Sequence, residues 1–194
     1  MITTNQQKFE NNNPVQQWLI RRFQNKLISN LTAVKPQSIL EVGCGEGFLL
    51  NVLARRFPDC RLMGIDNNRS ALVAGRQLFP HLVLEHGDAY RLDLADRSWD
   101  VVIASEVLEH LDRPQVALDE LHRVAQRYLL LSVPNEPWFR LSNLARGRHL
   151  RRLGNHPEHL NLWSRRAFED FVKTTVAPEL VTGAFPWTII RASV

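Results

Sequence analysis

A glycine-rich turn between two apolar segments constrains this chain more than any other feature. Residues 41–47 are Glu-Val-Gly-Cys-Gly-Glu-Gly, so that Gly43, Gly45 and Gly47 stand at alternate positions. Apolar residues typical of a short strand precede the turn, and the spacing of apolar residues over 48–57 predicts a helix after it. Because glycine lacks a Cβ atom, the turn can adopt positive φ and let a ligand touch the backbone, while N–H groups at the helix start attract that ligand. We therefore expect a nucleotide-like molecule to bind here.

The spacing of the glycines argues against a dinucleotide. A GxGxxG pattern that starts at Gly43 or Gly45 requires a further glycine at the fifth position after its first, where this chain has Phe48 or Leu50. Glu41, just before the glycines, would repel a pyrophosphate but suits a ligand that carries an ammonium and a sulfonium group. The turn therefore favours a cationic cofactor over NAD.

An acidic residue followed by GxGxG resembles the pattern of the class I methyltransferases that use S-adenosylmethionine. The resemblance implies that Glu41, Gly43, Gly45 and Gly47 bind this cofactor. A glycine-rich turn on its own is also a common structural turn. Further matches along the chain are therefore needed.

A second predicted strand ends in a carboxylate. The run over 61–66 closes on Asp66, the position from which a doubly wound sheet reaches ribose hydroxyls. The resemblance implies that Asp66, with the adjacent Asn67, belongs to the cofactor site. Asp66 could instead cap the next helix, but Asn67 or Asn68 is available for that role.

The third and fourth predicted strands add three residues to the expected cofactor site. After the strand over 82–86 the chain continues Gly-Asp-Ala, which matches the adenine-side motif of the resembled family. The match implies that Asp88 accepts a hydrogen bond from the adenine amino group beside Ala89, although a Gly-Asp turn is also a common way to end a strand. The strand over 99–105 is continuously apolar, as strands covered on both faces are, and Ser105 at its end is assigned to the same site.

Acidic and imidazole side chains follow the fourth strand. Glu106, Glu109 and His110 are spaced i, i+3 and i+4, so one helical turn would place them on one face, and His156 and His159 add two imidazoles. Such a set can hold Mg²⁺ or Mn²⁺, and it resembles metal-dependent O-methyltransferases, including some that act on the terminal ribose of small RNAs. The same Glu-His-Leu turn occurs in family members with no known metal. We therefore assign no metal, and expect His110 or His159 to take a proton from a hydroxyl acceptor.

Helical spacing of apolar residues predicts two more helices. The first starts with Asn13 as its N-cap and Pro14 at the first helical position, and the second spans 114–125. The residues expected on the apolar face of the first helix are Val15, Trp18, Leu19, Phe23, Leu27 and Leu31. Those expected on the apolar face of the second are Val116, Leu118, Leu121 and Val124. Core packing is the simpler role for the first helix, although such helices also cover the cofactor or the acceptor in the resembled family.

Strands and helices alternate through the remainder of the chain. A fifth strand is predicted over 128–134 and a helix over 164–172. Two strand-like runs, 179–185 and 187–194, meet at Pro186 with almost no loop and predict a hairpin. The resemblance implies that the final strand is reversed. We therefore predict an α/β fold with a Rossmann-like, doubly wound sheet of seven strands, mostly parallel with an antiparallel last strand.

Positive charge is concentrated in one segment of the predicted domain. We divide the chain into an N-terminal tail and helix over 1–35 and a class I methyltransferase domain over 36–194. Within the latter, 134–166 contains seven arginines and two glutamates, a formal charge of +5 against +4 for the whole chain. Because doubly wound folds bind ligands outside the carboxyl ends of their strands, we expect this basic segment to form a lid that attracts an anionic acceptor; a solvated surface is the alternative. Its arginines are Arg140, Arg146, Arg148, Arg151, Arg152, Arg165 and Arg166.

Composition favours a soluble, cytoplasmic protein with one domain. The chain has 194 residues, of which 44% are hydrophobic, enough for a full core. Residues 1–13 lack the apolar region of a signal peptide, and no apolar run reaches the ~20 residues of a membrane span, so we expect no membrane partner. Cys44 and Cys60 form neither a disulfide framework nor a zinc signature, and we expect both to be reduced.

The combined pattern predicts an enzyme that transfers the sulfonium methyl group of S-adenosylmethionine to a small acceptor, anionic or oxygen-bearing. One alternative is a metal-dependent O-methyltransferase, including one that methylates the 2′-hydroxyl of RNA; nucleic acid is the less favoured partner. Another is a protein that binds S-adenosylmethionine as a non-catalytic partner of an enzyme.

Overall fold

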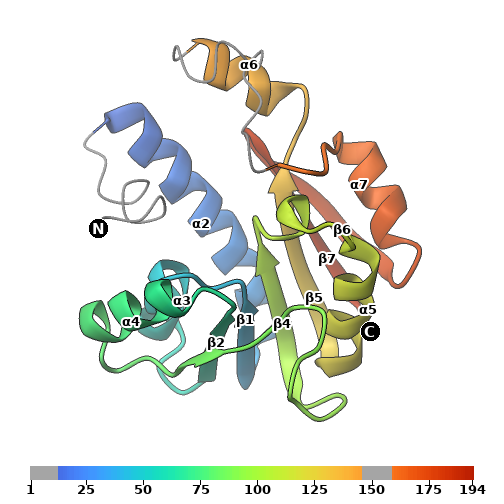
Figure 1. Ribbon diagram of the computed structural model, residues 1–194. Helices are drawn as coiled ribbons and strands as arrows, with labels where there is room; N and C mark the ends of the chain where they lie inside the picture. Colours follow the sequence, from blue (N-terminus) through green and yellow to red (C-terminus); the bar gives the residue numbers. More distant parts are fainter. Residues whose placement is uncertain (1–12, 146–158) are drawn as a thin grey trace.

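The computed structural model describes residues 13–145 and 159–194, which form a sheet with helices on both faces (Figure 1). The seven strands lie in the order β3–β2–β1–β4–β5–β7–β6. They are β1 (Ser38–Val42), β2 (Arg61–Asp66), β3 (Leu84–His86), β4 (Trp99–Ser105), β5 (Ala125–Pro134), β6 (Ala177–Ala184) and β7 (Trp187–Ser193). The first five run parallel to one another, and β7 runs antiparallel to both of its neighbours, β5 and β6. The predicted fold class is thereby confirmed.

Helices cover both faces of the sheet. One face is covered by α2 (Pro14–Val34), α3 (Phe48–Arg56) and α4 (Arg69–Leu78), whose apolar side chains form two clusters with those of the strands. The other face is covered by α5 (Pro114–Val124) and α7 (Arg165–Val172). A short 3₁₀ turn, η1 (Leu108–His110), follows β4, and α6 (Trp138–Ala145) follows β5. No helix in the described ranges combines the length and apolarity needed to cross a membrane.

The start of α2 follows the predicted capping. The Asn13 side chain accepts hydrogen bonds from the backbone N–H groups of Val15 and Gln16, with Pro14 at the start of the helix. The expected apolar face is wrong in part, because Val15 and Trp18 are 60% and 56% exposed. Trp18 lies nine residues before the fully buried Leu27, which is two and a half turns and therefore the opposite side of the helix.

The second correction concerns α5. Val116 is 42% exposed, whereas Leu118 and Leu121 are fully buried. Two residues correspond to about 200° around a helix, so Val116 cannot share the face of Leu118. The helix ends at Val124 and β5 begins at Ala125, three residues before the predicted strand.

The hairpin at the end of the chain is confirmed. β6 and β7 pair from Ala177 opposite Ser193 to Ala184 opposite Trp187, so that residues 185 and 186 make the turn. Because Pro134 at the carboxyl end of β5 pairs with Trp187, the hairpin tip lies at the same edge of the sheet as the ends of the parallel strands. This edge holds the candidate site.

Candidate functional site

The glycine turn joins β1 to α3 in the conformation that glycine permits. Gly43, Gly45 and Gly47 have φ values of 77°, 55° and 81°, which favour glycine over other residues. The backbone N–H groups of Gly43 and Cys44 donate to the carbonyl of Ile65 at 2.7 and 3.1 Å, which fixes the turn to β2. A Cβ atom at Gly43 would lie 2.3 Å from the Val107 side chain, so the backbone passes closer to its surroundings than another residue would allow.

Asp66 connects the end of β2 to this turn. Its Oδ2 accepts from the Gly45 N–H at 2.7 Å, and its Oδ1 accepts from the Asn68 N–H at 2.8 Å. Asn68 caps α4, accepting from Ser70 and Ala71, whereas Asn67 is exposed. Each carboxylate oxygen has two lone pairs, so Asp66 retains acceptor capacity for the hydroxyls of a ribose.

Glu41 is a buried carboxylate directly before the turn. Its side chain is 4% exposed, and burial, followed by the nearby charge of Asp66, raises its pKa to about 8. The N–H of Leu50 in the first turn of α3 donates to it. Among the described residues, nothing forms a hydrogen bond with the buried Glu41 Oε2. A carboxylate in this state fits a ligand that brings a positive charge, such as the ammonium group of S-adenosylmethionine.

The other predicted cofactor residues lie at the ends of neighbouring strands. Asp88, after β3, is exposed, and its Oδ1 accepts from the Tyr90 N–H at 2.9 Å, so the carboxylate shapes its own turn. Ala89 packs against the edge of the main core. Ser105 ends β4, with its Oγ 3.1 Å from that of Ser132. The residues predicted from sequence therefore share the carboxyl edge of the sheet.

Glu106 does not join Glu109 and His110 on one helical face, as the spacing predicted. Glu106 has a φ of 57°, and only the short turn η1 follows it, so the backbone turns away before a helix can form. Its Oε1 accepts from the Trp187 Nε1–H at 2.6 Å. Glu106 is thus directed toward β7.

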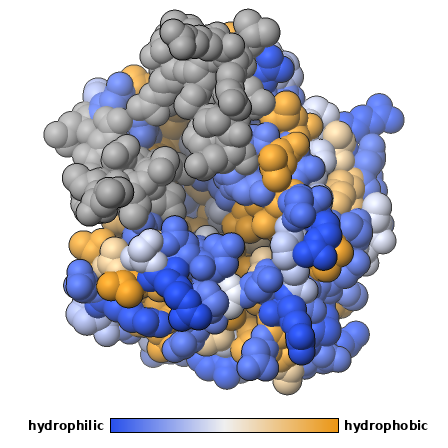
Figure 2. All heavy atoms as spheres, viewed as in Figure 1, coloured by the Kyte–Doolittle hydropathy of each residue, from blue (hydrophilic) through white to orange (hydrophobic). Residues whose placement is uncertain are grey.

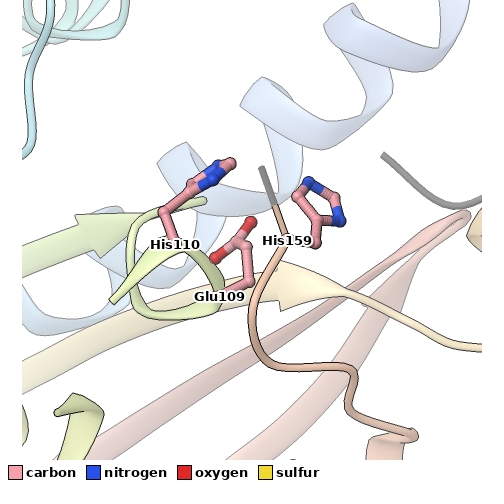
Figure 3. A group of neighbouring side chains, drawn as sticks. All are labelled: Glu109, His110 and His159. Atoms are coloured by element: carbon pink, nitrogen blue, oxygen red, sulfur yellow. The ribbon is translucent and has the colours of Figure 1, made fainter. Parts of the chain in front are cut away.

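A different trio takes its place. Ligand atoms of Glu109, His110 and His159 all lie within 4.8 Å of one another, and Figure 3 shows the three side chains converging from η1 and from the chain that leads to α7. Glu109 is 1% exposed. The rings of His110 and His159 are 5.0 Å apart, and Phe139 of α6 lies 5.3 Å from His159. His156 lies outside the described residues.

Asn161, which the sequence analysis missed, holds this trio together. Its side-chain amide donates to the carbonyls of Leu108 at 3.2 Å and Leu111 at 2.6 Å. The backbone N–H groups of Leu160 and Asn161 both donate to the Glu109 carbonyl, at 2.8 and 3.0 Å. The segment that carries His159 is thereby fastened to η1. A single asparagine between two leucines gives no signal of such a role in the sequence.

The basic segment is described only in part. Arg146, Arg148, Arg151 and Arg152 lie outside the described residues. Arg165 is not free to meet a ligand, because its guanidinium donates to the Val181 carbonyl at 2.6 Å. The face seen in Figure 2 is hollowed near its centre, where hydrophobic and hydrophilic side chains meet.

Known proteins share this domain. A sequence model described as a methyltransferase domain matches residues 40–128, from β1 through the glycine turn to the start of β5. A S-adenosylmethionine-dependent methyltransferase from Aquifex aeolicus has a TM-score of 0.66 at 17% identity, over 81% of this chain and 82% of that one. The methyltransferase domain of bacterial CtHen1 has a TM-score of 0.73 at 22% identity, over 91% of this chain and 100% of that one. These two likenesses show the fold.

A curated relative shares part of its length with this chain. The trans-aconitate 2-methyltransferase of Yersinia pestis (strain Pestoides F) is 31% identical over 105 residues. The match covers 54% of this chain and 40% of the relative. The chain thus spans less than half of the curated protein that it matches.

Proposed function

We propose that this chain, which carries a methyltransferase domain of the class I, S-adenosylmethionine-dependent type, transfers the sulfonium methyl group of that cofactor to a small acceptor that is anionic or oxygen-bearing. The observation that carries the proposal is the buried Glu41 beside the glycine turn, with a raised pKa and an oxygen that lacks a hydrogen bond among the described residues. A cationic ligand supplies what this carboxylate lacks. Asp66 then accepts from the ribose, and Asp88 from the adenine.

The chemistry asks little of the protein beyond alignment. S-adenosylmethionine supplies a methyl group that is already activated, so the chain has to orient the acceptor in line with it and exclude water. His110 and His159 are within reach of each other at the carboxyl edge of the sheet. Either imidazole is suited to take the proton of a hydroxyl acceptor near neutral pH.

An anionic acceptor is in keeping with two observations. The segment over 134–166, which includes His159 of the trio, has a formal charge of +5. The Yersinia relative is named for trans-aconitate, which is a carboxylate. We do not extend that substrate to this chain, but propose its chemical class.

The acceptor is found by incubating the protein with a metabolite extract and S-adenosylmethionine labelled in its methyl group. Mass spectrometry should show one or more labelled products that depend on the protein. The Asp66→Ala variant serves as the control, because it weakens cofactor binding without touching the acceptor side. Label transfer that is equal in the two proteins, or absent from wild type across extracts, contradicts the proposal.

A second candidate function, metal-dependent O-methylation, is favoured by the trio. One carboxylate and two imidazoles within 4.8 Å of one another are a donor set for a divalent cation. Because Glu106 is directed to Trp187 instead, imidazoles outnumber carboxylates, which suits Mn²⁺ better than Mg²⁺. A bound cation would polarise an acceptor hydroxyl, including the 2′-hydroxyl of an RNA.

Metal binding is tested directly by calorimetry with Mn²⁺ in wild type and in His159→Ala. This candidate predicts a single Mn²⁺ site that His159→Ala weakens, while S-adenosylhomocysteine binds both proteins equally. Equal Mn²⁺ affinity in the two proteins contradicts it. The imidazoles then act only as proton acceptors.

A further inference from the structure

A basic groove lies on the outer side of α2, against the end of β6. Its volume is about 540 Å³, within the range of roughly 300 to 1,000 Å³ typical of small-molecule sites. The described lining comes from one face of α2 and from Gly183 and Ala184. The helical residues that matter most are Trp18, Arg21, Arg22 and Lys26.

The charge of this groove is of one sign. Arg21, Arg22 and Lys26 line it, and none of its described lining residues is acidic. Within the described parts of the chain, no carboxylate forms a salt bridge with these three cations. Arg22 and Lys26 are also four residues apart, where like charges destabilise a helix. Three cations in one concave surface favour an anionic ligand.

Trp18 gives the groove an aromatic surface. The indole is 56% exposed and lies on the side of α2 opposite the buried Leu27. The guanidinium carbon of Arg22 is 5.4 Å from the centre of its ring. An indole next to a guanidinium is a surface on which a flat heteroaromatic ring can stack.

Gly183 leaves room for a ligand over the β6 backbone. An added Cβ atom there would meet only the Trp187 carbonyl oxygen, at 3.8 Å. The space above this strand residue is therefore open. A glycine within a strand lowers the stability of that strand and often marks a site where a ligand or another backbone approaches closely.

The helical lining of the groove lies on the side of α2 that faces away from the core. Phe23, on the buried side of α2, packs against Trp187 with ring centres 4.9 Å apart, and Trp187 in turn donates to Glu106. Ala184, which lines the groove, pairs with Trp187 across the hairpin, so the groove borders the carboxyl edge of the sheet. Figure 1 shows α2 beside the strands of that edge.

We propose that this groove binds a nucleotide, with phosphate on Arg21, Arg22 and Lys26 and the base stacked on Trp18. Phosphate accounts for three cations that form no salt bridge with the described residues, the base accounts for the exposed indole, and Gly183 admits the ribose or base next to the strand. The nucleotide is either free or part of a single strand, since both present the same chemistry. This inference is independent of methyl transfer and of the acceptor.

Two variants test the groove in the full chain. Arg22→Ala combined with Lys26→Ala removes two charges, and Gly183→Val fills the open space without changing charge, with a residue that suits a strand. Arg55→Ala combined with Arg56→Ala is the matched control, because it removes two exposed arginines from α3. Calorimetry with ADP and fluorescence polarisation with a labelled single-stranded decanucleotide measure binding. S-adenosylhomocysteine affinity, measured in every variant, reports that the fold is intact.

We expect ADP, the decanucleotide or both to bind wild type, and expect both groove variants to weaken binding by about tenfold or more, while the control variant changes it less than threefold. If ADP and the decanucleotide bind with equal affinity, the groove is assigned to free nucleotides. If the decanucleotide binds more tightly, the groove is assigned to single-stranded nucleic acid. If neither ADP nor the decanucleotide binds wild type, the proposal is overturned. Binding that Gly183→Val leaves unchanged, or that the control variant weakens as much as the groove variants do, also overturns it.

Discussion

We propose that the cofactor site depends most on Asp66, because its two oxygens accept hydrogen bonds from the glycine turn and from the start of α4 at once. We predict that Asp66→Ala weakens S-adenosylhomocysteine binding by about 1 to 3 kcal/mol, the usual cost of leaving polar partners without a hydrogen bond. Calorimetry measures the change, with Asp59→Ala as a control for loss of one exposed carboxylate. Unchanged affinity in Asp66→Ala would mean that the ribose is held elsewhere.

We predict that Glu41 makes cofactor binding depend on pH. Its pKa is about 8 in the protein alone, so the carboxylate is largely protonated near neutral pH and has to lose a proton to pair with a cationic ligand. S-adenosylhomocysteine affinity should therefore rise as pH increases from about 6 to about 8, and Glu41→Gln should flatten this rise. A profile that is the same in both proteins would remove Glu41 from the ligand's surroundings.

The same residue predicts the sign of a stability effect. The pKa of Glu41 rises from 4.5 to about 8 on folding, so the folded chain holds this proton more tightly than the unfolded chain does. The contribution of this protonated group to the free energy of unfolding is fully present below pH 4.5 and is lost as pH rises toward 8. Without ligand, urea unfolding at these pH values should show Glu41→Gln losing less stability with rising pH than wild type.

Gly45 tests whether the turn serves a ligand or only the fold. Its φ of 55° disfavours a β-branched residue, and a valine side chain would enter the space that we assign to the cofactor. We predict that Gly45→Val abolishes S-adenosylhomocysteine binding in a chain that still folds, as circular dichroism would show. Gly183→Val is the glycine control and should retain affinity. A folded Gly45→Val protein with undiminished affinity would make the turn purely structural.

Among the elements, the chain before α7 is fastened to η1 through Asn161, and this contact positions His159 beside His110. We predict that Asn161→Ala preserves S-adenosylhomocysteine affinity, lowers kcat by about tenfold or more, and shifts the pH profile of kcat, because a displaced imidazole no longer accepts the proton. Leu162→Ala, an exposed neighbour, is the control. A changed kcat without any change in the pH profile would leave Asn161 with a structural role alone.

Elements were predictable from sequence where local signals were strong. The Asn13 cap, the glycine turn, the alternation of strands and helices and the hairpin at Pro186 follow from capping, glycine spacing and apolar patterns. Trp18 and Val116 are apolar but lie on the exposed sides of their helices, so apolar character without angular position does not predict burial. The short helix α6 lies in a segment whose most prominent sequence feature is its positive charge.

The candidate site was predictable residue by residue, but not in its geometry. Asp66 and Glu41 stand at fixed distances from the glycines in sequence, so their place followed from the pattern. Glu106 did not, because its left-handed backbone and its bond to Trp187 depend on β7, which lies 81 residues later. Asn161 donates to backbone carbonyls, and every residue has one, so the sequence does not indicate which of them it contacts.

At the scale of the molecule, the residues of the candidate site lie together at the carboxyl edge of the sheet. The glycine turn, Asp66 and the trio of Glu109, His110 and His159 come from distant parts of the chain, and the doubly wound topology brings the carboxyl ends of their strands together. The proposed nucleotide groove borders this edge on the outer side of α2. We therefore assign methyl transfer to the glycine turn and the trio, and nucleotide binding to the outer side of α2.

Calorimetry with S-adenosylhomocysteine and with NAD, on the same wild-type preparation, tests the central claim most directly. A class I methyltransferase site in which Glu41 precedes the glycines should bind S-adenosylhomocysteine, with an affinity that Gly45→Val abolishes. It should bind NAD weakly or not at all, because a pyrophosphate offers Glu41 no positive charge to pair with. NAD that bound more tightly than S-adenosylhomocysteine, and that lost its affinity in Gly45→Val, would contradict the account.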